Sequence, residues 1–332
     1  MEYANIFLKV INVKVVITAR NMKTGSADIE ERLQYPSLEV VNYTDLNLSM
    51  DTSEDTLYEL VKDADYIIAG VEPYTRNLLK RLPKLKMISK RGIGFDSVDI
   101  EACKELGITV TRTTGAVEAA VAEHVLAYLF YFARRIDLQN TTLQKGIWKR
   151  IMVSGLRGSS IGLVGFGGIG KEIALRAYPM GMKIYYYCRH PQIKWEKEYH
   201  VEYKPLDELL ELSDYVSVNV PLTKDTENMI DHDFISKMKQ DSILINIARG
   251  AIQDDQAILE GIISKKLRGA AIDVFRNEPC LDSILLGYEN IILTPHSASY
   301  TDECFGNMNY RSVDNLLEYL TGNLDEKYYV VK

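Results

Sequence analysis

The sequence of 332 residues lacks long apolar runs, paired cysteines and an excess of positive charge. No stretch approaches the roughly 20 apolar residues of a membrane-spanning helix. The apolar run at 15–19 lacks the flanking parts of a secretory signal, so we interpret it as a first β-strand. The four cysteines are scattered, without C-x-x-C or metal-ligand spacing, so we expect neither a disulfide framework nor a metal site. We therefore predict a cytoplasmic protein without a membrane partner.

The net charge of −7 argues against non-specific binding to nucleic acid, and we expect no nucleic-acid partner. The rest of the composition, 46% hydrophobic and 26% charged, is that of an ordinary globular protein. The length predicts about two domains.

A glycine-rich segment, Gly165–Gly170, has the sequence GFGGIG and fits the pattern G-x-G-x-x-G. The apolar run Ile161–Val164 precedes it, a helical pattern follows it, and a second apolar run lies at Ile184–Tyr187. Strand, glycine turn, helix and strand in this order are the context in which the motif indicates dinucleotide binding.

Each glycine of this motif has a physical role. Gly165 permits the tight turn after the strand, and Gly167 lets the pyrophosphate approach the backbone because it has no Cβ. Gly170 allows the helix to pack close to the strand. The start of the helix then offers unpaired N–H groups and a partial positive charge to the phosphates.

The end of the second strand selects between NAD and NADP. An NAD site usually carries Asp or Glu there, to accept hydrogen bonds from the adenosine ribose. This chain has Cys188, followed by Arg189 and His190. No carboxylate would repel a 2′-phosphate, and Arg189 can pair with one, so we favour NADP. The alternative is that Arg189 is a solvated loop residue and the site binds NAD through the sugar alone.

Strand and helix patterns alternate along both halves of the chain, which indicates parallel sheets with crossover helices. We expect strands at 14–19, 39–43, 66–70, 85–89, 107–112, 161–164, 184–187, 215–220, 242–246, 270–274 and 291–293. Further helices are expected at 54–61, 77–81, 116–135, 206–212, 234–238, 254–265 and 301–320. The predicted class is therefore α/β.

Three chemically active residues follow different strands in the half that carries the glycine turn: Arg249, Glu278 and His296. Ligands of open parallel sheets bind beyond the carboxyl ends of the strands. A cation, a carboxylate and an imidazole converging on a nicotinamide would form a hydride-transfer site. Singly, each has a plainer interpretation: a surface ion pair for Arg249, a turn residue for Glu278 and a loop histidine for His296.

With these motifs, nearly the whole chain from about residue 65 to 322 resembles the D-isomer-specific 2-hydroxyacid dehydrogenases. The motifs are GIGFDSVDIEACKELGITVT (92–111), VAEHVLAYL (121–129), the glycine turn, PLTKDT (221–226), NIARGAI (246–252), AAIDVFRNEP (270–279) and LTPHSA (293–298). The departure is Cys188-Arg189 in place of the usual acidic residue, which is similar to the NADPH-using branch.

The resemblance implies catalytic roles. Arg249 would bind the substrate carboxylate and polarise the carbonyl, and His296 would be the general acid, or the base in reverse. Glu278 would hydrogen-bond His296, orient its ring and favour the imidazolium.

The resemblance also implies binding contacts. The substrate would be held by Arg249, His296 and the backbone around Val71, Glu72, Gly92 and Ile93. Cofactor contacts are implied for Gly165, Gly167, Gly168, Ile169, Gly170, Arg189, Val220, Ile247, Ala248, Asp273, Ser297 and Ala298, with Asp273 near the nicotinamide carboxamide.

The family fold implies two Rossmann-like parallel-sheet domains. A substrate domain of residues 1–112 and 301–332 would be split by an inserted nucleotide-binding domain of residues 113–300. Members are usually homodimers, with the region 116–135 in the interface. The chain stops soon after its last predicted helix, so we expect no C-terminal regulatory domain.

We therefore predict a reversible NAD(P)-dependent reductase of a small 2-keto acid, NADPH-preferring and similar to glyoxylate or hydroxypyruvate reductases. One alternative is an NAD-dependent D-3-phosphoglycerate or D-lactate dehydrogenase. A basic cluster would favour a phosphorylated substrate, and Lys90 and Arg91 are the candidates, unless they are simply solvated. An alternative of another class is a nucleotide-sensing binding protein, like the co-repressors of the same family, because a fold does not fix a function.

Overall fold

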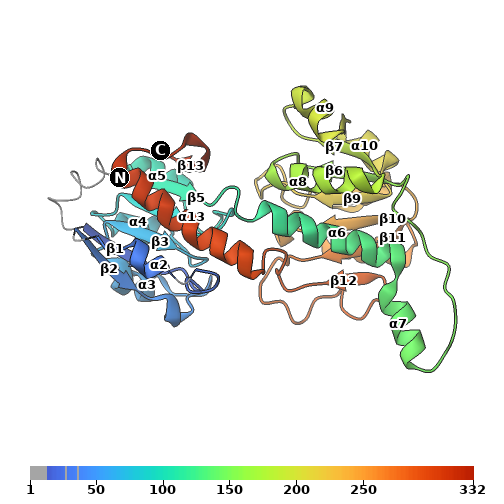
Figure 1. The fold of residues 1–332 in the computed structure, drawn as a ribbon, viewed down its shortest axis with the longest axis horizontal. Helices are drawn as coiled ribbons and strands as arrows, with labels where there is room; N and C mark the ends of the chain where they lie inside the picture. Colours follow the sequence, from blue (N-terminus) through green and yellow to red (C-terminus); the bar gives the residue numbers. More distant parts are fainter. Residues whose placement is uncertain (1–12, 27, 36) are drawn as a thin grey trace. The chain divides into compact units, whose positions relative to one another are not determined.

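The computed structural model describes residues 13–332 except 27 and 36. It divides into two compact units, the described residues of 1–117 with 300–332, and residues 118–299. Residues 1–12, which belong to the first segment expected for the substrate domain, lie outside the described residues. Each unit is built on its own largely parallel sheet (Figure 1), which confirms the predicted α/β fold with one Rossmann-like unit inserted into another.

The first unit contains a six-stranded sheet in the order β13-β5-β4-β3-β1-β2. All neighbours are parallel except β13, which runs antiparallel to β5. The strands are β1 (Val13–Ile17), β2 (Leu38–Asn42), β3 (Tyr66–Ala69), β4 (Met87–Lys90), β5 (Thr109–Arg112) and β13 (Tyr329–Val331).

Helices cover both faces of this sheet, because the side chains of each strand alternate between two apolar cores. One core contains Val16, Ile67 and Ile88 with side chains of α3 (Glu54–Val61), α4 (Arg76–Lys80) and α5 (Ile100–Leu106). The other contains Val15 and Ile68 with side chains of α2 (Ile29–Arg32) and α13 (Asp302–Thr321). Short 3-10 turns lie at Thr44–Leu46 and Glu326–Tyr328.

The second unit contains a seven-stranded parallel sheet in the order β12-β11-β10-β9-β6-β7-β8. The strands are β6 (Ser160–Val164), β7 (Lys183–Tyr187), β8 (Glu202–Tyr203), β9 (Tyr215–Val218), β10 (Ser242–Asn246), β11 (Leu267–Ile272) and β12 (Ile291–Leu293). The strand order reverses direction between β6 and β9. Ligands of open α/β sheets bind beyond the carboxyl ends of the strands at such a switch point.

The helices of the second unit are α6 (Glu118–Arg134), α7 (Ile136–Gln144), α8 (Gly168–Ala177), α9 (Glu196–Tyr199), α10 (Leu206–Leu212), α11 (His232–Lys237) and α12 (Asp255–Ile263). Side chains of α10, α11 and α12 share one apolar core with the sheet. Helices α6 and α8 pack against each other, and Phe132 of α6 contacts β11 at Gly269. In α6, Val121, Val125, Leu129 and Phe132 are buried, whereas Phe130 is exposed.

Several elements were not predicted from the sequence: α2, α5, α7, α9, β8 and β13. Strand β11 also begins at Leu267 rather than at 270. Helix α7 buries none of its residues, so it carries no apolar stripe that periodicity could detect. Strands β8 and β13 have only two and three residues, too few for an alternating pattern.

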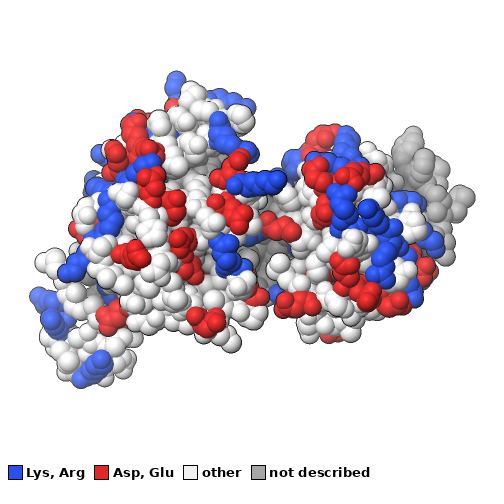
Figure 2. All heavy atoms as spheres, turned by 180° about the vertical axis from the view of Figure 1, so that it is seen from behind, with Lys and Arg blue, Asp and Glu red and all other residues white. Residues whose placement is uncertain are grey.

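In the described part of the chain, no helix is long and apolar enough to cross a lipid bilayer. Acidic and basic side chains are interspersed over the face of each unit that Figure 2 shows.

Candidate active site

The glycine turn after β6 has the backbone geometry that its sequence predicts. Gly165 has φ +101°, a region that side chains other than glycine rarely adopt, and a Cβ there would lie 2.9 Å from the backbone of Asn219. A Cβ on Gly170 would lie 2.5 Å from the carbonyl oxygen of Gly165. The turn between β6 and α8 therefore closes only with glycine at both positions.

The start of α8 fits a dinucleotide phosphate. A Cβ on Gly167 would meet no atom within 4 Å, so the backbone is open to an approaching group at this point. Gly167 caps the helix without a side-chain hydrogen bond, which leaves N–H groups of the first turn, at Gly168 and Ile169, for an anion. The residues present therefore fit the pyrophosphate of a dinucleotide.

Three further residues expected to touch the cofactor follow strands beside this turn. Val220 follows β9, and its Cγ1 lies 3.1 Å from the position of a Cβ on Gly165. Ile247 and Ala248 directly follow β10 and are 7% exposed. Their contacts with a cofactor remain predictions.

The loop after β7 carries no carboxylate at the position that selects the cofactor. The Cys188 thiol donates to the carbonyl oxygen of His190 at 3.1 Å. Arg189 is exposed, and its side chain has no ion-pair or hydrogen-bond partner among the described residues. Burial and the nearby charge of Lys194 lower the pKa of Lys171 on α8, whereas Glu198 and Cys188 raise it. Lys171 and Lys194 therefore lie near the same loop as Arg189.

Glu278 and His296 are paired at the carboxyl ends of β11 and β12. His296 Nδ1 lies 2.7 Å from Glu278 Oε2, and Glu278 Oε1 accepts from the N–H of Phe275 at 2.9 Å. With Nδ1 donating to the carboxylate, Nε2 is left for a substrate. Burial alone would raise the pKa of Glu278, but the hydrogen bonds from His296 and Phe275 and the charges of His296 and Arg249 lower it below its ordinary value.

Arg249 belongs to the same cluster, because its charge acts on Glu278. It directly follows Ala248 after β10, and its Nη1 donates to the Ala248 carbonyl at 2.6 Å. The fully buried Asn246 fixes this turn: its Oδ1 accepts from Ala248 N–H at 3.0 Å, and its Nδ2 donates to Arg249 O at 3.1 Å. The structure thus brings together the three residues predicted to be catalytic.

Asp273 holds the segment that carries His296. Its Oδ1 accepts from the N–H of Ser297 at 2.8 Å and its Oδ2 from the N–H of Ala298 at 3.0 Å, while its carbonyl oxygen accepts from His296 N–H at 2.7 Å. His296 has φ +49°, a left-handed conformation that is sparsely populated by residues other than glycine. Contacts of Asp273, Ser297 and Ala298 with the nicotinamide remain predictions.

Sequence reasoning missed a hydrogen-bonded group behind Asp273. Thr294 Oγ1 donates to Asp273 Oδ1 at 2.5 Å and also lies 2.5 Å from the hydroxyl of Tyr128, which lies 2.8 Å from His124 Nε2. Burial lowers the pKa of His124, although Asp273 opposes this. The separation of His124 and Tyr128 by four residues on a predicted helix places them on one face, a signal that could have identified the pair.

The residues expected to hold the substrate carboxylate follow β3 and β4 in the first unit. The N–H groups of Val71 and Ile93 donate to no acceptor within the described residues, whereas Gly92 N–H donates to Thr113 Oγ1 at 3.0 Å. The Glu72 side chain is fully buried, and its Oε1 accepts from Gly70 N–H at 2.8 Å. The buried Glu72 carboxylate therefore stabilises the loop after β3 through its hydrogen bond with Gly70.

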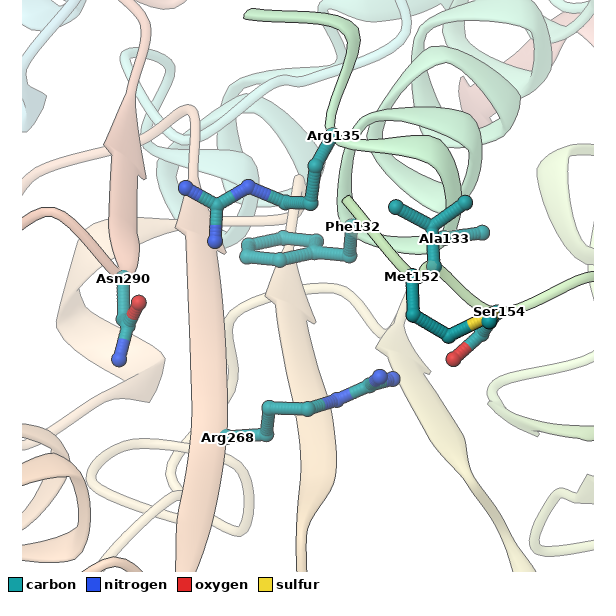
Figure 3. Close-up of a pocket in the computed structure, with 8 residues that line it drawn as sticks. Phe132, Ala133, Arg135, Met152, Ser154, Arg268 and Asn290 are labelled. Carbon is teal, nitrogen blue, oxygen red and sulfur yellow. The ribbon is translucent and has the colours of Figure 1, made fainter. Parts of the chain in front are cut away.

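A pocket of about 180 Å³ in the second unit lies away from these residues. Figure 3 shows Phe132 between Arg135 and Arg268, with Asn290 beside them. Arg268 stands at the start of β11 and Asn290 just before β12, whereas Asp273 and Thr294 follow the same strands. The pocket thus lies at the amino ends of these strands, whereas His296 lies beyond the carboxyl end of β12.

Comparison with known proteins gives a consistent result. Residues 126–298 match the model for the NAD binding domain of D-isomer specific 2-hydroxyacid dehydrogenases. The chain is 37% identical to a glyoxylate reductase of Thermococcus litoralis, over 81% of this chain and 84% of the relative. It is 35% identical to a hydroxypyruvate reductase of Thermotoga maritima, over 85% and 93%.

A solved structure is similar as well. The D-lactate dehydrogenase of Aquifex aeolicus, crystallised with NAD and lactic acid, superposes with a TM-score of 0.82 at 29% identity, over 96% of this chain and 99% of that one.

Proposed function

Because the chain belongs to the D-isomer specific 2-hydroxyacid dehydrogenase family, we propose that it reduces a small 2-keto acid such as glyoxylate or hydroxypyruvate, with NADPH preferred. Membership of the family makes it an NAD(P)-dependent oxidoreductase that acts on CH–OH groups. The observation that carries the proposal is the Glu278–His296 pair, 2.7 Å apart, beside Arg249.

The chain's own residues supply the acid–base part of this reaction. A bound nicotinamide cofactor would donate or accept the hydride. His296 Nε2 would protonate the carbonyl oxygen during reduction, because Nδ1 is engaged by Glu278. Arg249 would bind the substrate carboxylate with its planar guanidinium. The glycine turn after β6 would hold the cofactor pyrophosphate, and the N–H groups of Val71 and Ile93 remain the predicted contacts of the substrate carboxylate.

NADPH preference is supported by the charges around the end of β7. A 2′-phosphate would meet Arg189, whose side chain has no partner in the described part of the chain. The neighbouring Lys171 and Lys194 add positive charge near Cys188. An adenosine ribose of NAD would find no carboxylate to bind it at this position.

Initial rates with hydroxypyruvate and glyoxylate, measured with NADPH and with NADH, test both parts of the proposal. We expect turnover with a higher kcat/KM for NADPH. Arg189→Ser should lower kcat/KM for NADPH by about 10- to 100-fold, because a charge-assisted contact is lost. Its kcat/KM for NADH should stay within about twofold of the wild-type value. A preference for NADH in the wild type would overturn the cofactor assignment alone, whereas no turnover of any 2-keto acid would overturn the function.

We also propose that the enzyme is a cytoplasmic homodimer. Helix α7 and the segment after it, through 155, form an arm with exposed apolar side chains, such as Trp148 at 81% and Met152 at 97%. In Figure 2 the arm (lower left) shows mostly uncharged surface with a few charged side chains. A second copy of the chain would cover this surface, because patches of this kind mark interaction sites.

Light scattering tests this assembly. Trp148→Asp with Met152→Asp should convert a dimer to a monomer, because two charges would be placed in an apolar interface. The control Ile263→Asp changes a side chain that is 63% exposed at the end of α12 and should leave the mass unchanged. A monomeric wild type would contradict the proposal.

A further inference from the structure

Two arginines lie beyond the carboxyl ends of strands in the first unit, at the edge that carries the substrate loops. Arg91 directly follows β4 and precedes Gly92, and Arg20 follows β1 by three residues. Strands β1 and β4 flank β3, whose end carries Val71. Ligands of parallel sheets bind beyond this edge, so both arginines stand where a substrate is expected.

Arg91 is a largely buried cation without a carboxylate partner. Its guanidinium stacks on the Phe305 ring at 4.6 Å and its Nε donates to Asn309 Oδ1, but its buried Nη2 has no hydrogen-bond partner among the described residues. Burial lowers the pKa of Arg91 to about 10, with smaller effects from Cys304, Tyr300 and Arg20. None of these groups is a carboxylate, and a buried charge is costly unless it is paired.

Arg20 is half-buried, and no hydrogen bond or ion pair of its side chain occurs within the part of the chain described. Asn309 connects it to Arg91: the amide that accepts from Arg91 also donates to the carbonyl oxygens of Asn21 at 3.1 Å and Met22 at 3.0 Å. The loop that carries Arg20 is thereby fixed against the Arg91 side chain.

Three other arginines of this unit have acidic partners, whereas Arg112 at the end of β5 lies over the Phe95 ring and its buried Nε has no hydrogen-bond partner among the described residues. Arg32 pairs with Asp314 at 2.7 Å, Arg81 pairs with Asp55 at 3.0 Å, and Arg76 pairs with Glu105. Arg20 and Arg91 thus form a cationic pair without an acidic partner among the described residues at this edge of the sheet, where they attract an anion from outside the chain.

We propose that Arg20 and Arg91 form a subsite for a second anionic group on the substrate. The preferred substrates are then 2-keto acids with a carboxylate, sulfonate or phosphate on the carbon chain, in addition to the C1 carboxylate. The inference rests on the proposed function. It narrows the substrate class to 2-keto acids with two anionic groups, whereas glyoxylate and hydroxypyruvate carry only one. It also assigns a role to Arg91 that a solvated arginine would not have.

The test compares two dianionic substrates, oxaloacetate and 3-sulfopyruvate, with the monoanions hydroxypyruvate and glyoxylate. We expect the wild-type kcat/KM to be about tenfold or more higher for the two dianions than for the two monoanions. Arg20→Gln should remove about 10- to 100-fold of kcat/KM for that pair and leave the other two substrates within about twofold. Arg20 is chosen for the substitution because its side chain has no hydrogen-bond or ion-pair partner among the described residues, whereas Arg91→Lys keeps the charge and should retain part of the preference.

Arg81→Gln is the matched control, since it removes the same charge from an exposed ion pair of the same unit. Inorganic sulfate, which carries the anionic group alone, should compete with oxaloacetate in the wild type and lose this effect in Arg20→Gln.

Three results would overturn the subsite. Equal losses for all four substrates would assign the arginines to the C1 carboxylate. If Arg20→Gln has the same kcat/KM as the wild type for all four substrates, the two arginines do not bind substrate. If the wild type has a higher kcat/KM for hydroxypyruvate than for oxaloacetate and 3-sulfopyruvate, the preference for a second anionic group is wrong. If the wild type reduces no 2-keto acid, the proposed function fails. In that case the melting temperature with and without oxaloacetate tests the subsite separately. If the subsite exists, oxaloacetate should raise the melting temperature of the wild type but not that of Arg20→Gln.

Discussion

Replacing Glu278 by Gln tests how much the carboxylate contributes to the acid–base step. Gln keeps the shape of the side chain but removes the negative charge 2.7 Å from His296 Nδ1. A charge-assisted hydrogen bond contributes about 1.5–3 kcal/mol. The two side chains are 30% and 47% exposed, which favours the lower part of that range because water screens the charge. We therefore expect kcat to fall about 10- to 100-fold.

The pH profile gives a second readout of the same pair. The pKa of Glu278 is lowered in the folded protein, so the carboxylate is ionised above its ordinary pKa and the pair is lost as the pH falls through the lowered value. Wild-type activity should therefore decline at the acid end of the profile, and Glu278→Gln should lack this titration.

The assay is steady-state reduction of hydroxypyruvate across the pH range, with melting temperature as a check on folding. Glu289→Gln is the control, because it removes the same charge from an exposed residue just before the start of β12. If Glu278→Gln reduces kcat by less than about threefold with an unchanged pH profile, the carboxylate does not act through His296.

Two further changes test the turns that carry the site. Gly167→Ala should fold normally, because its Cβ would meet no atom within 4 Å, but it should weaken cofactor binding. Gly170→Ala should instead lower the free energy of unfolding by about 1–3 kcal/mol, because its Cβ would lie 2.5 Å from Gly165 O. Calorimetry measures the stability and cofactor titration measures the affinity, and an equal loss of stability in both variants would contradict this prediction. Asn246→Ala should destabilise the protein by about 1–3 kcal/mol and raise KM for the keto acid, because it releases the turn of Ala248 and Arg249; an unchanged melting temperature and KM would refute this role.

The sequence alone was sufficient for the elements with strong periodic or glycine signals. Strand β10 and helix α10 have the predicted bounds, because polar turn residues flank their apolar residues and mark where each element begins and ends. The positions of Arg249, Glu278 and His296 after successive strands also predicted their convergence, since the carboxyl ends of parallel strands meet at one edge.

The parts that could not be predicted depend on tertiary packing. Helix α7 buries no side chain, so nothing in its own sequence demanded a helix. The link from His124 through Tyr128 to Thr294 spans 170 residues, and no local pattern reveals such a contact. The sequence left Arg91 either as a contact for a phosphorylated substrate or as a solvated residue, and only its packing on Phe305 and Asn309 shows that much of its side chain is covered.

The most direct test of the central claim is the rate of 2-keto acid reduction by His296→Ala at saturating cofactor. If His296 is the general acid, kcat should fall by about 10²- to 10⁴-fold while the affinity for NADPH is retained, because the cofactor loop after β6 is untouched. Turnover within about threefold of the wild type would contradict the account, and a wild type that binds cofactor without reducing any 2-keto acid would point to a nucleotide-sensing protein instead.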